Sequence, residues 1–86
     1  MDPQAVRQFA RDLRRRADDL GRINGLTSAA SVTMRDTWRD AKYDAFMRLL
    51  DEATLEIRQF CDYAARYAEH LDKKAAGVER YLEDRY

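Results

Sequence analysis

Hydrophobic residues recur at helical spacing in two long segments of the chain. The first segment follows Asp2-Pro3, and an aspartate at the N-cap with a proline at the first helical position is typical of a helix start. Its apolar or small residues are one, three or four positions apart, which keeps them on one side of a helix. They are Val6, Phe9, Ala10, Leu13, Ala17, Leu20, Ile23, Thr27, Ala30, Met34 and Trp38. The pattern predicts a helical arm over residues 3–36.

Gly21 and Gly25 are the weak points of this arm. Each glycine costs roughly 1 kcal/mol relative to alanine in a helix, and an Asn-Gly pair such as the one ending at Gly25 favours a turn. A break here would divide the arm into two helices. Because the apolar spacing keeps its phase from Leu20 through Ile23 to Thr27, we predict one continuous helix.

The second segment carries a similar apolar pattern and predicts a second arm over residues 41–77. Its apolar or small residues are Phe46, Leu49, Leu50, Ala53, Ile57, Phe60, Cys61, Ala64, Tyr67, Ala68, Leu71, Ala75, Val78 and Leu82. Gly77 follows two lysines, a combination that favours the end of a helix. Residues 78–86 are therefore expected to form a loosely ordered tail.

Residues 37–42 lie between the two arms and contain the only tryptophan, Trp38. We interpret this stretch as the bend of an antiparallel helical hairpin, with Trp38 as a core residue at its tip. Thr37 or Asp40 is expected to cap the second helix, and Phe46 is expected to be its first large core residue.

Composition supports an all-α chain of one domain over residues 1–86. Of the 86 residues 37% are charged, and only three are glycine and one is proline, so helix formers outnumber turn formers. Two helices side by side bury only the strips that face each other, and the remaining apolar surface predicts a second hairpin. We expect dimerisation into a four-helix bundle, as a homodimer or as a heterodimer with a similar hairpin.

The residues expected to form the core or the dimer interface share the apolar spacing described above. They are Val6, Phe9, Leu13, Leu20, Ile23, Met34, Leu49, Leu50, Ile57, Phe60, Tyr67 and Leu71.

The charge balance gives no reason to expect a nucleic-acid partner. Lys and Arg (16) equal Asp and Glu (16) in number, which removes the simplest electrostatic attraction. The basic run from Arg11 to Arg16 is interrupted by Asp12, and the expected use of these charges is in the helical pairs Asp12–Arg16 and Arg15–Asp19. A nucleic-acid binder using this run is the minor alternative.

No catalytic, cofactor or metal site is predicted, since the sequence has neither a Gly-rich loop nor a nucleophile spaced to meet a base. The single cysteine, Cys61, leaves no internal disulfide and too few ligands for structural zinc. Its place on the apolar pattern predicts a small buried hydrophobic residue. His70, flanked by Glu69 and Asp72, is expected on a solvated surface, and Glu56 belongs to an acidic surface cluster.

The N-terminus and the hydropathy pattern bear on localisation. Met1 is followed by Asp2-Pro3 rather than by a basic stretch and an apolar run, so no cleavable signal peptide is expected. No apolar run approaches the ~20 residues of a membrane span. We expect synthesis in the cytoplasm, and any secretion would proceed without such a signal.

The bend resembles the Trp-x-Gly family of small helical-hairpin proteins, the ESAT-like substrates of type VII secretion. The matching features are two long arms, Trp38 near the midpoint of the chain, and an aromatic residue, Phe46, eight positions later. The resemblance covers the whole chain in architecture and residues 38–46 as a motif. It implies a non-enzymatic interaction protein that is secreted or that carries another polypeptide, with a secretion ATPase as a further partner.

Two features depart from that family. Asp40 stands where the family has glycine, and it is able to act as an N-cap instead. Family members often carry a tyrosine followed four residues later by Asp or Glu, which resembles an export signal, whereas Tyr81 is followed by Arg85. Tyr81, Leu82 and Tyr86 are the candidates for tail recognition. The alternative is an intracellular coiled-coil adaptor or structural protein that is not exported.

Overall fold

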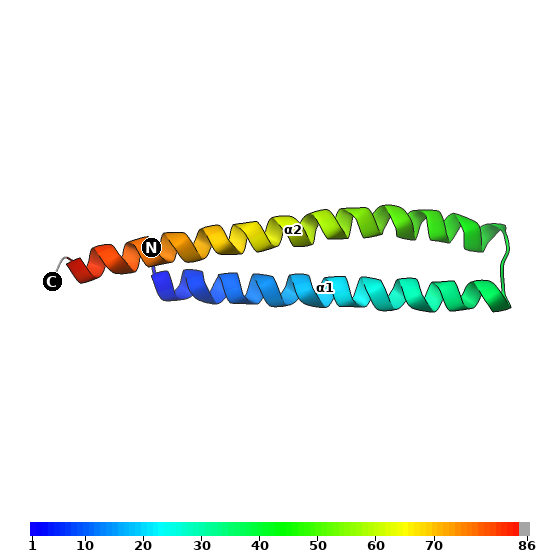
Figure 1. The fold of residues 1–86 in the computed structure, drawn as a ribbon, viewed down its shortest axis with the longest axis horizontal. Helices are drawn as coiled ribbons and strands as arrows, with labels where there is room; N and C mark the ends of the chain where they lie inside the picture. The colour runs from blue at the N-terminus through cyan, green and yellow to red at the C-terminus, as the bar shows by residue number, and fades with distance from the viewer. Residues whose placement is uncertain (85–86) are drawn as a thin grey trace.

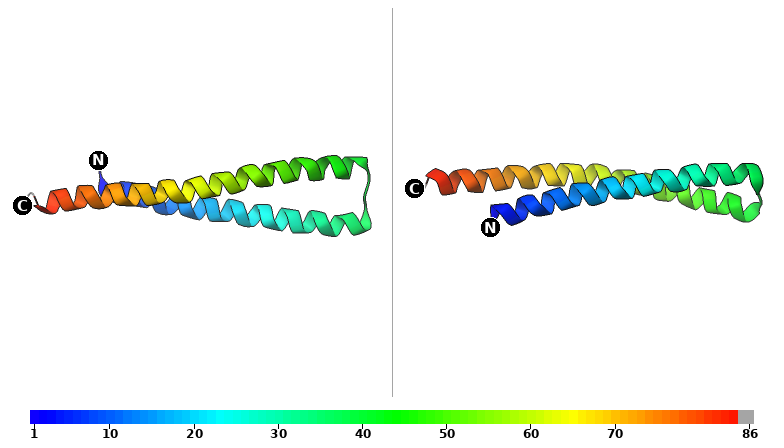
Figure 2. Two further views of the ribbon diagram at one scale, coloured as in Figure 1. Left: turned by 45° about the horizontal axis from the view of Figure 1, so that its top comes forward. Right: turned by 90° about the horizontal axis from the view of Figure 1, so that it is seen from below.

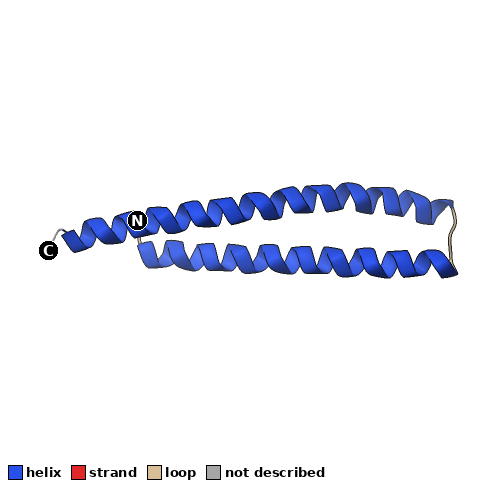
Figure 3. Cartoon of the chain, viewed as in Figure 1, coloured by secondary structure: helices blue, strands red, loops and turns tan. Residues whose placement is uncertain are grey.

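The computed structural model describes residues 1–84 and contains two α-helices in this range, α1 (Pro3–Thr37) and α2 (Ala41–Asp84). Residues 38–40 join them in a tight bend (Figures 1 and 3). The helices run antiparallel, pack against each other, and wind around each other at a shallow angle (Figure 2). The predicted all-α hairpin is confirmed.

Helix α1 begins as the sequence predicts. The Asp2 carboxylate accepts hydrogen bonds from the backbone N–H groups of Gln4 (3.0 Å) and Ala5 (3.3 Å), and Pro3 occupies the first turn. These bonds satisfy N–H groups that would lack a partner at a helix start. The helix ends where Trp38 adopts an extended backbone conformation.

Helix α1 continues through both glycines, which confirms the prediction of one helix. Between the two glycines, the Asn24 side chain accepts a hydrogen bond from the Thr54 hydroxyl of α2 (3.2 Å). A Cβ atom at Gly21 would lie 4.0 Å from the Cys61 Sγ of α2. Packing against α2 at Gly21 and the hydrogen bond at Asn24 therefore support a segment with weak helix propensity.

Helix α2 does not end at Gly77, as the sequence suggested, but continues to Asp84. The apolar spacing stays in phase across Gly77, because Ala75 is buried and Val78 is half-buried. The Arg7 guanidinium of α1 also binds Glu79, two residues beyond this glycine. Packing and an ion pair thus outweigh the low helix propensity of Gly77. As a result, the end of α2 projects beyond the N-terminus of α1 (Figure 1).

The buried core of the described chain consists of alanines alone. Ala10 and Ala17 from α1 meet Ala64, Ala68 and Ala75 from α2. Small side chains allow the helices to approach closely, but they leave little apolar area to bury. We call this row of alanines the seam.

The hairpin is too elongated to enclose a globular core. Its Cα radius of gyration is 19.6 Å, whereas a compact chain of this length has about 12 Å. Its accessible surface is 7030 Å², against about 5,300 Å² for a globular monomer of this mass. The molecule therefore exposes much surface that folded monomers usually bury.

Candidate interaction surface

The seam divides the hairpin into two faces of opposite character. Seam residues Ala10 and Ala17 are seven positions apart, as are Ala68 and Ala75, which is the spacing of an antiparallel coiled coil. The residue immediately before each alanine, such as Phe9 before Ala10 or Tyr67 before Ala68, lies on one face. The residue four positions after it, such as Arg14 or Asp72, lies on the other.

The first face, which we call the open face, carries large exposed hydrophobic side chains from both helices. Its members are spaced by seven, eleven or fourteen residues, which keeps them on one side of each helix. They are Phe9, Ile23 and, near the bend, Met34 on α1, and Phe46, Phe60 and Tyr67 on α2. Leu49 lies eleven residues before Phe60, or about three helical turns, and so points to the same side.

Three shallow hollows follow one another along the open face. Phe9, Tyr67 and Leu71 line the hollow at the terminal end. Leu20, Ile23 and Phe60 line the middle hollow together with Arg16 and Asp19. Ala30, Met34, Tyr43 and Phe46 contribute to the hollow near the bend. Each hollow draws apolar side chains from both helices, so the open face is continuous along the hairpin.

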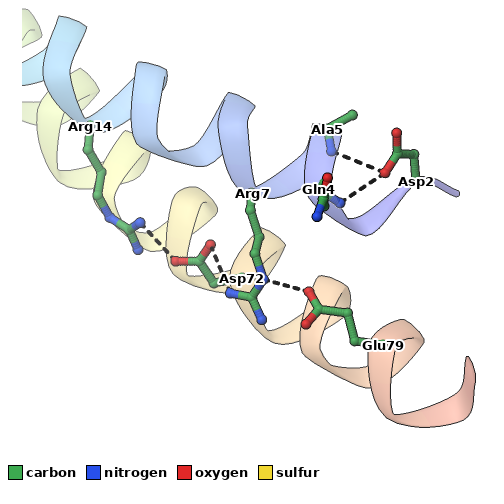
Figure 4. Close-up of polar contacts among 7 residues, drawn as sticks. All are labelled: Asp2, Gln4, Ala5, Arg7, Arg14, Asp72 and Glu79. Carbon is green, nitrogen blue, oxygen red and sulfur yellow. Dashed lines mark hydrogen bonds and ion pairs between the residues drawn. The ribbon is translucent and has the colours of Figure 1, made fainter. Parts of the chain in front are cut away.

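The second face, which we call the paired face, carries ion pairs between the two helices at its terminal end. Arg7 binds Glu79 (2.6 Å) and approaches Asp72 (4.0 Å), and Arg14 binds Asp72 (2.8 Å), as Figure 4 shows. These pairs were not predicted from the sequence. The signal was present in the seven-residue spacing of Arg7 and Arg14 on α1 and of Asp72 and Glu79 on α2.

The charge pairs on α1 differ from those expected from the sequence. The structure pairs Arg15 with Asp12 (3.3 Å) and Arg22 with Asp19 (3.8 Å), rather than Asp12 with Arg16 and Arg15 with Asp19. Both observed pairs span three residues, whereas the predicted pairs spanned four. Arg16 has no ion-pair partner among residues 1–84, and it lies on the open face.

The bend is built around Asp40. One oxygen of its carboxylate accepts a hydrogen bond from the backbone N–H of Tyr43 (2.8 Å), and the other accepts one from the Trp38 indole N–H (3.0 Å). Asp40 is thus the N-cap of α2. No residue in the described range has a positive φ, so this bend does not require the glycine found in the Trp-x-Gly motif.

Trp38 itself is not a core residue of the isolated hairpin, because its side chain is 67% exposed. The interpretation of Trp38 as a buried tip residue is wrong. Tyr43 instead connects the helices near the bend, since its hydroxyl donates to the Ser31 carbonyl oxygen of α1 (2.6 Å). The indole is held by Asp40 with most of its surface open.

The two bonds to Asp40 predict an acid-sensitive bend. They lower the pKa of the Asp40 carboxyl, and the Tyr43 N–H contributes more than the Trp38 indole. An unfolded Asp titrates near ~3.9. The stabilisation is therefore fully present above that pH and is lost as the pH falls through the lower pKa of the folded state.

Asp40→Ala should accordingly lower the melting temperature at pH 7, and the difference from wild type should shrink towards pH 3. Thermal melts followed by circular dichroism at a series of pH values measure this difference. Asp51→Ala is the control, because Asp51 is exposed and makes no ion pair within residues 1–84. A difference between Asp40→Ala and wild type that stays constant with pH would contradict the role of the carboxylate charge.

The predicted apolar set separates into two groups in the structure. The half-buried group lies beside the seam and consists of Val6, Leu13, Leu20, Leu50, Ile57 and Leu71. The exposed group consists of Phe9, Ile23, Met34, Phe46, Leu49, Phe60 and Tyr67. The second group is larger in side-chain volume and makes up most of the open face.

The remaining residues named in the sequence analysis are Cys61, His70, Tyr81, Leu82 and Tyr86. The Cys61 thiol is half-buried and donates a hydrogen bond to the Ala17 carbonyl oxygen (3.3 Å). His70 is exposed and stacks on Tyr67, with 6.2 Å between the ring centroids. Tyr81 and Leu82 are exposed in the last turns of α2, whereas Tyr86 lies outside the described residues.

Residues 1–84 contain neither a cluster of metal ligands nor a helix that could cross a membrane. No group of three or more His, Cys, Asp or Glu side chains is placed to hold a metal ion in this range. Neither helix, over the residues described, is long and apolar enough to span a membrane. A comparison with known proteins gives no matching family model, no matching curated protein and no matching solved structure.

Proposed function

We propose that this chain is a non-enzymatic interaction protein whose open face is covered by a second helical hairpin, so that the two hairpins form a four-helix bundle. The observation that carries this proposal is the contrast between the two faces. Ion pairs between the helices close one face near the chain termini, while large apolar side chains recur along the other, with Arg16 and Asp19 among them in the middle. An apolar surface of this extent is typical of a protein–protein interface.

The size of the open face supports a stable interface. The hairpin measures 68 by 16 Å in the plane that contains both helices, which gives a face on the order of 1,000 Å². Stable interfaces bury about 800 Å² on each partner. A second hairpin has the length and the helical shape to cover this face completely.

The proposed biological role is that of a type VII secretion substrate, or of the partner that carries such a substrate. The resemblance at Trp38 and Phe46 supports it, together with the hairpin architecture and the exposure of the indole at the bend. Partners would then include a secretion ATPase. The competing role is an intracellular coiled-coil adaptor, which the basic Arg85 four residues after Tyr81 favours.

Two measurements test these proposals. Light scattering at micromolar concentration should give a mass above that of one chain, either for the protein by itself or after a partner hairpin is added. A monomer that melts sharply and binds no hairpin would refute the interaction role. A secretion assay should show export that is lost when the chain is truncated after Gly77. Retention of the full-length protein in cells with a type VII system would favour the adaptor.

A further inference from the structure

Charged side chains on the open side of α2 have opposite signs on the two sides of Tyr63. Glu52 and Glu56 precede this tyrosine by eleven and seven residues, and Lys74 and His70 follow it by the same numbers. Three- and four-residue steps connect them with the large residues of the open face, which keeps all of them in one row along the helix. The row is Glu52, Glu56, Phe60, Tyr63, Tyr67, His70 and Lys74.

The four polar members of this row have no ion-pair partner within residues 1–84. Glu52, Glu56, His70 and Lys74 are all exposed, and none of them takes part in the ion pairs of the described chain. A hairpin laid over the open face would remove water from them, which is costly unless each one gains a partner. The covering hairpin therefore needs a cation or a hydrogen-bond donor opposite each glutamate and an acid opposite the lysine.

We propose that the covering hairpin is a second copy of this chain, docked antiparallel about a two-fold axis at Tyr63. This inference rests on the four-helix bundle proposed above and names its partner. The axis lies in the interface and crosses both helices, so it places α1 on α1 and α2 on α2 and reverses the direction of the hairpin. Residues equally far from Tyr63 then face each other. Glu52 of each copy pairs with Lys74 of the other, and in the same way Glu56 pairs with His70.

The length of α2 supports the same axis. The helix runs from Ala41 to Asp84, and Tyr63 is at its middle. Two α2 helices related by this axis therefore overlap from end to end. The position that pairs the charges is also the position that covers the most apolar surface, and burial of apolar surface drives association.

Helix α1 gains a similar pair at the same level. Cys61 lies beside residues 17 and 21 of α1, so Tyr63, two residues later, lies near the level of residue 17. Arg16 and Asp19 are on either side of this level and line the open face. The two-fold axis therefore brings Arg16 of each copy close to Asp19 of the other along the bundle.

The other two-fold arrangement leaves charges of this row without partners. Its axis runs along the hairpin, so the two hairpins point the same way and each α1 lies on the α2 of the other copy. The level of each residue within one hairpin then also decides what it meets in the other. Glu52 lies opposite residues 26–28 and Lys74 lies opposite Val6, all of which are uncharged. The antiparallel arrangement is therefore favoured.

Charge reversal tests the pairing. Glu52→Lys and Lys74→Glu should each raise the dimer dissociation constant about tenfold, because two-fold symmetry creates two like-charge contacts per dimer. The double variant Glu52→Lys/Lys74→Glu should recover most of the wild-type affinity. Sedimentation equilibrium measures all of these constants.

The matched controls are Glu69→Lys and Lys73→Glu. These two residues form an ion pair within the chain (3.2 Å). Glu69 lies nine residues, or two and a half turns, after Phe60 and so is on the side of α2 opposite the open face. Both substitutions should leave the dissociation constant unchanged.

Spin labels at the bend test the orientation. In an Ala41→Cys/Cys61→Ser chain, labels on the two copies should be about 65 Å apart in the antiparallel dimer, since each bend lies ~22 residues from the axis. Labels within about 25 Å, or a double charge variant no tighter than either single one, would overturn this inference while leaving the interaction role intact. A monomer that binds only a different hairpin would do the same. A monomer that binds no hairpin would overturn the proposed function as well.

Discussion

Phe60→Glu is expected to dissociate the proposed four-helix bundle and to lower its melting temperature. Phe60 lies at the centre of the open face and is 49% exposed in the single hairpin, so the remaining ring surface is available to a partner. Burying a whole phenylalanine side chain stabilises by about 1.5–3 kcal/mol, of which covering the exposed half of Phe60 would supply about half, and the glutamate would in addition bring a charge into an apolar contact. We expect the dissociation constant to rise at least 100-fold, as measured by sedimentation equilibrium.

The control for this experiment is Leu55→Glu. Leu55 is also on α2 and is 61% exposed, but five residues separate it from Phe60, which places it on a different side of the helix. This substitution should leave the dissociation constant nearly unchanged. Equal effects of the two variants would show that general surface hydrophobicity, and not the open face, drives association.

Ala68→Leu is expected to separate the two helices of each hairpin. Ala68 is completely buried in the seam, and the seam is built from alanines that allow a close approach of the backbones. Extra methylene groups in a well-packed core cost typically 1–3 kcal/mol. For a hairpin with so small a core we expect a fall in melting temperature of about 5–10 °C, followed by circular dichroism.

Ala65→Leu provides the matched control on the same helix. Ala65 is exposed, and leucine has nearly the helix propensity of alanine, so the melting temperature should change little. An unchanged melting temperature for Ala68→Leu would mean that the helices tolerate a wider separation. Close packing at the seam would then not be the source of the stability of the hairpin.

Much of the local structure was predictable because it depends on neighbours in the sequence. The start of α1 follows from Asp2-Pro3, and the start of α2 follows from the carboxylate of Asp40 three residues before Tyr43. The two helices follow from apolar residues at three- and four-residue spacing. The end of α2 was not predictable in this way, since Glu79 is held by Arg7, which is 72 residues away.

The division of the apolar residues into seam and open face required the tertiary structure. A helical stripe wide enough to hold both Ala68 and Tyr67 does not reveal which of them faces the partner helix. Hydrophobicity alone would place the larger residue inside, whereas the structure places the alanine there and leaves the ring exposed. The sequence by itself determined where the helices lie and that they carry apolar surface. Only the packing of α1 against α2 decided which side chains are buried between them. The helices approach closely, so the smallest residues lie in the seam and the largest ones lie beside it.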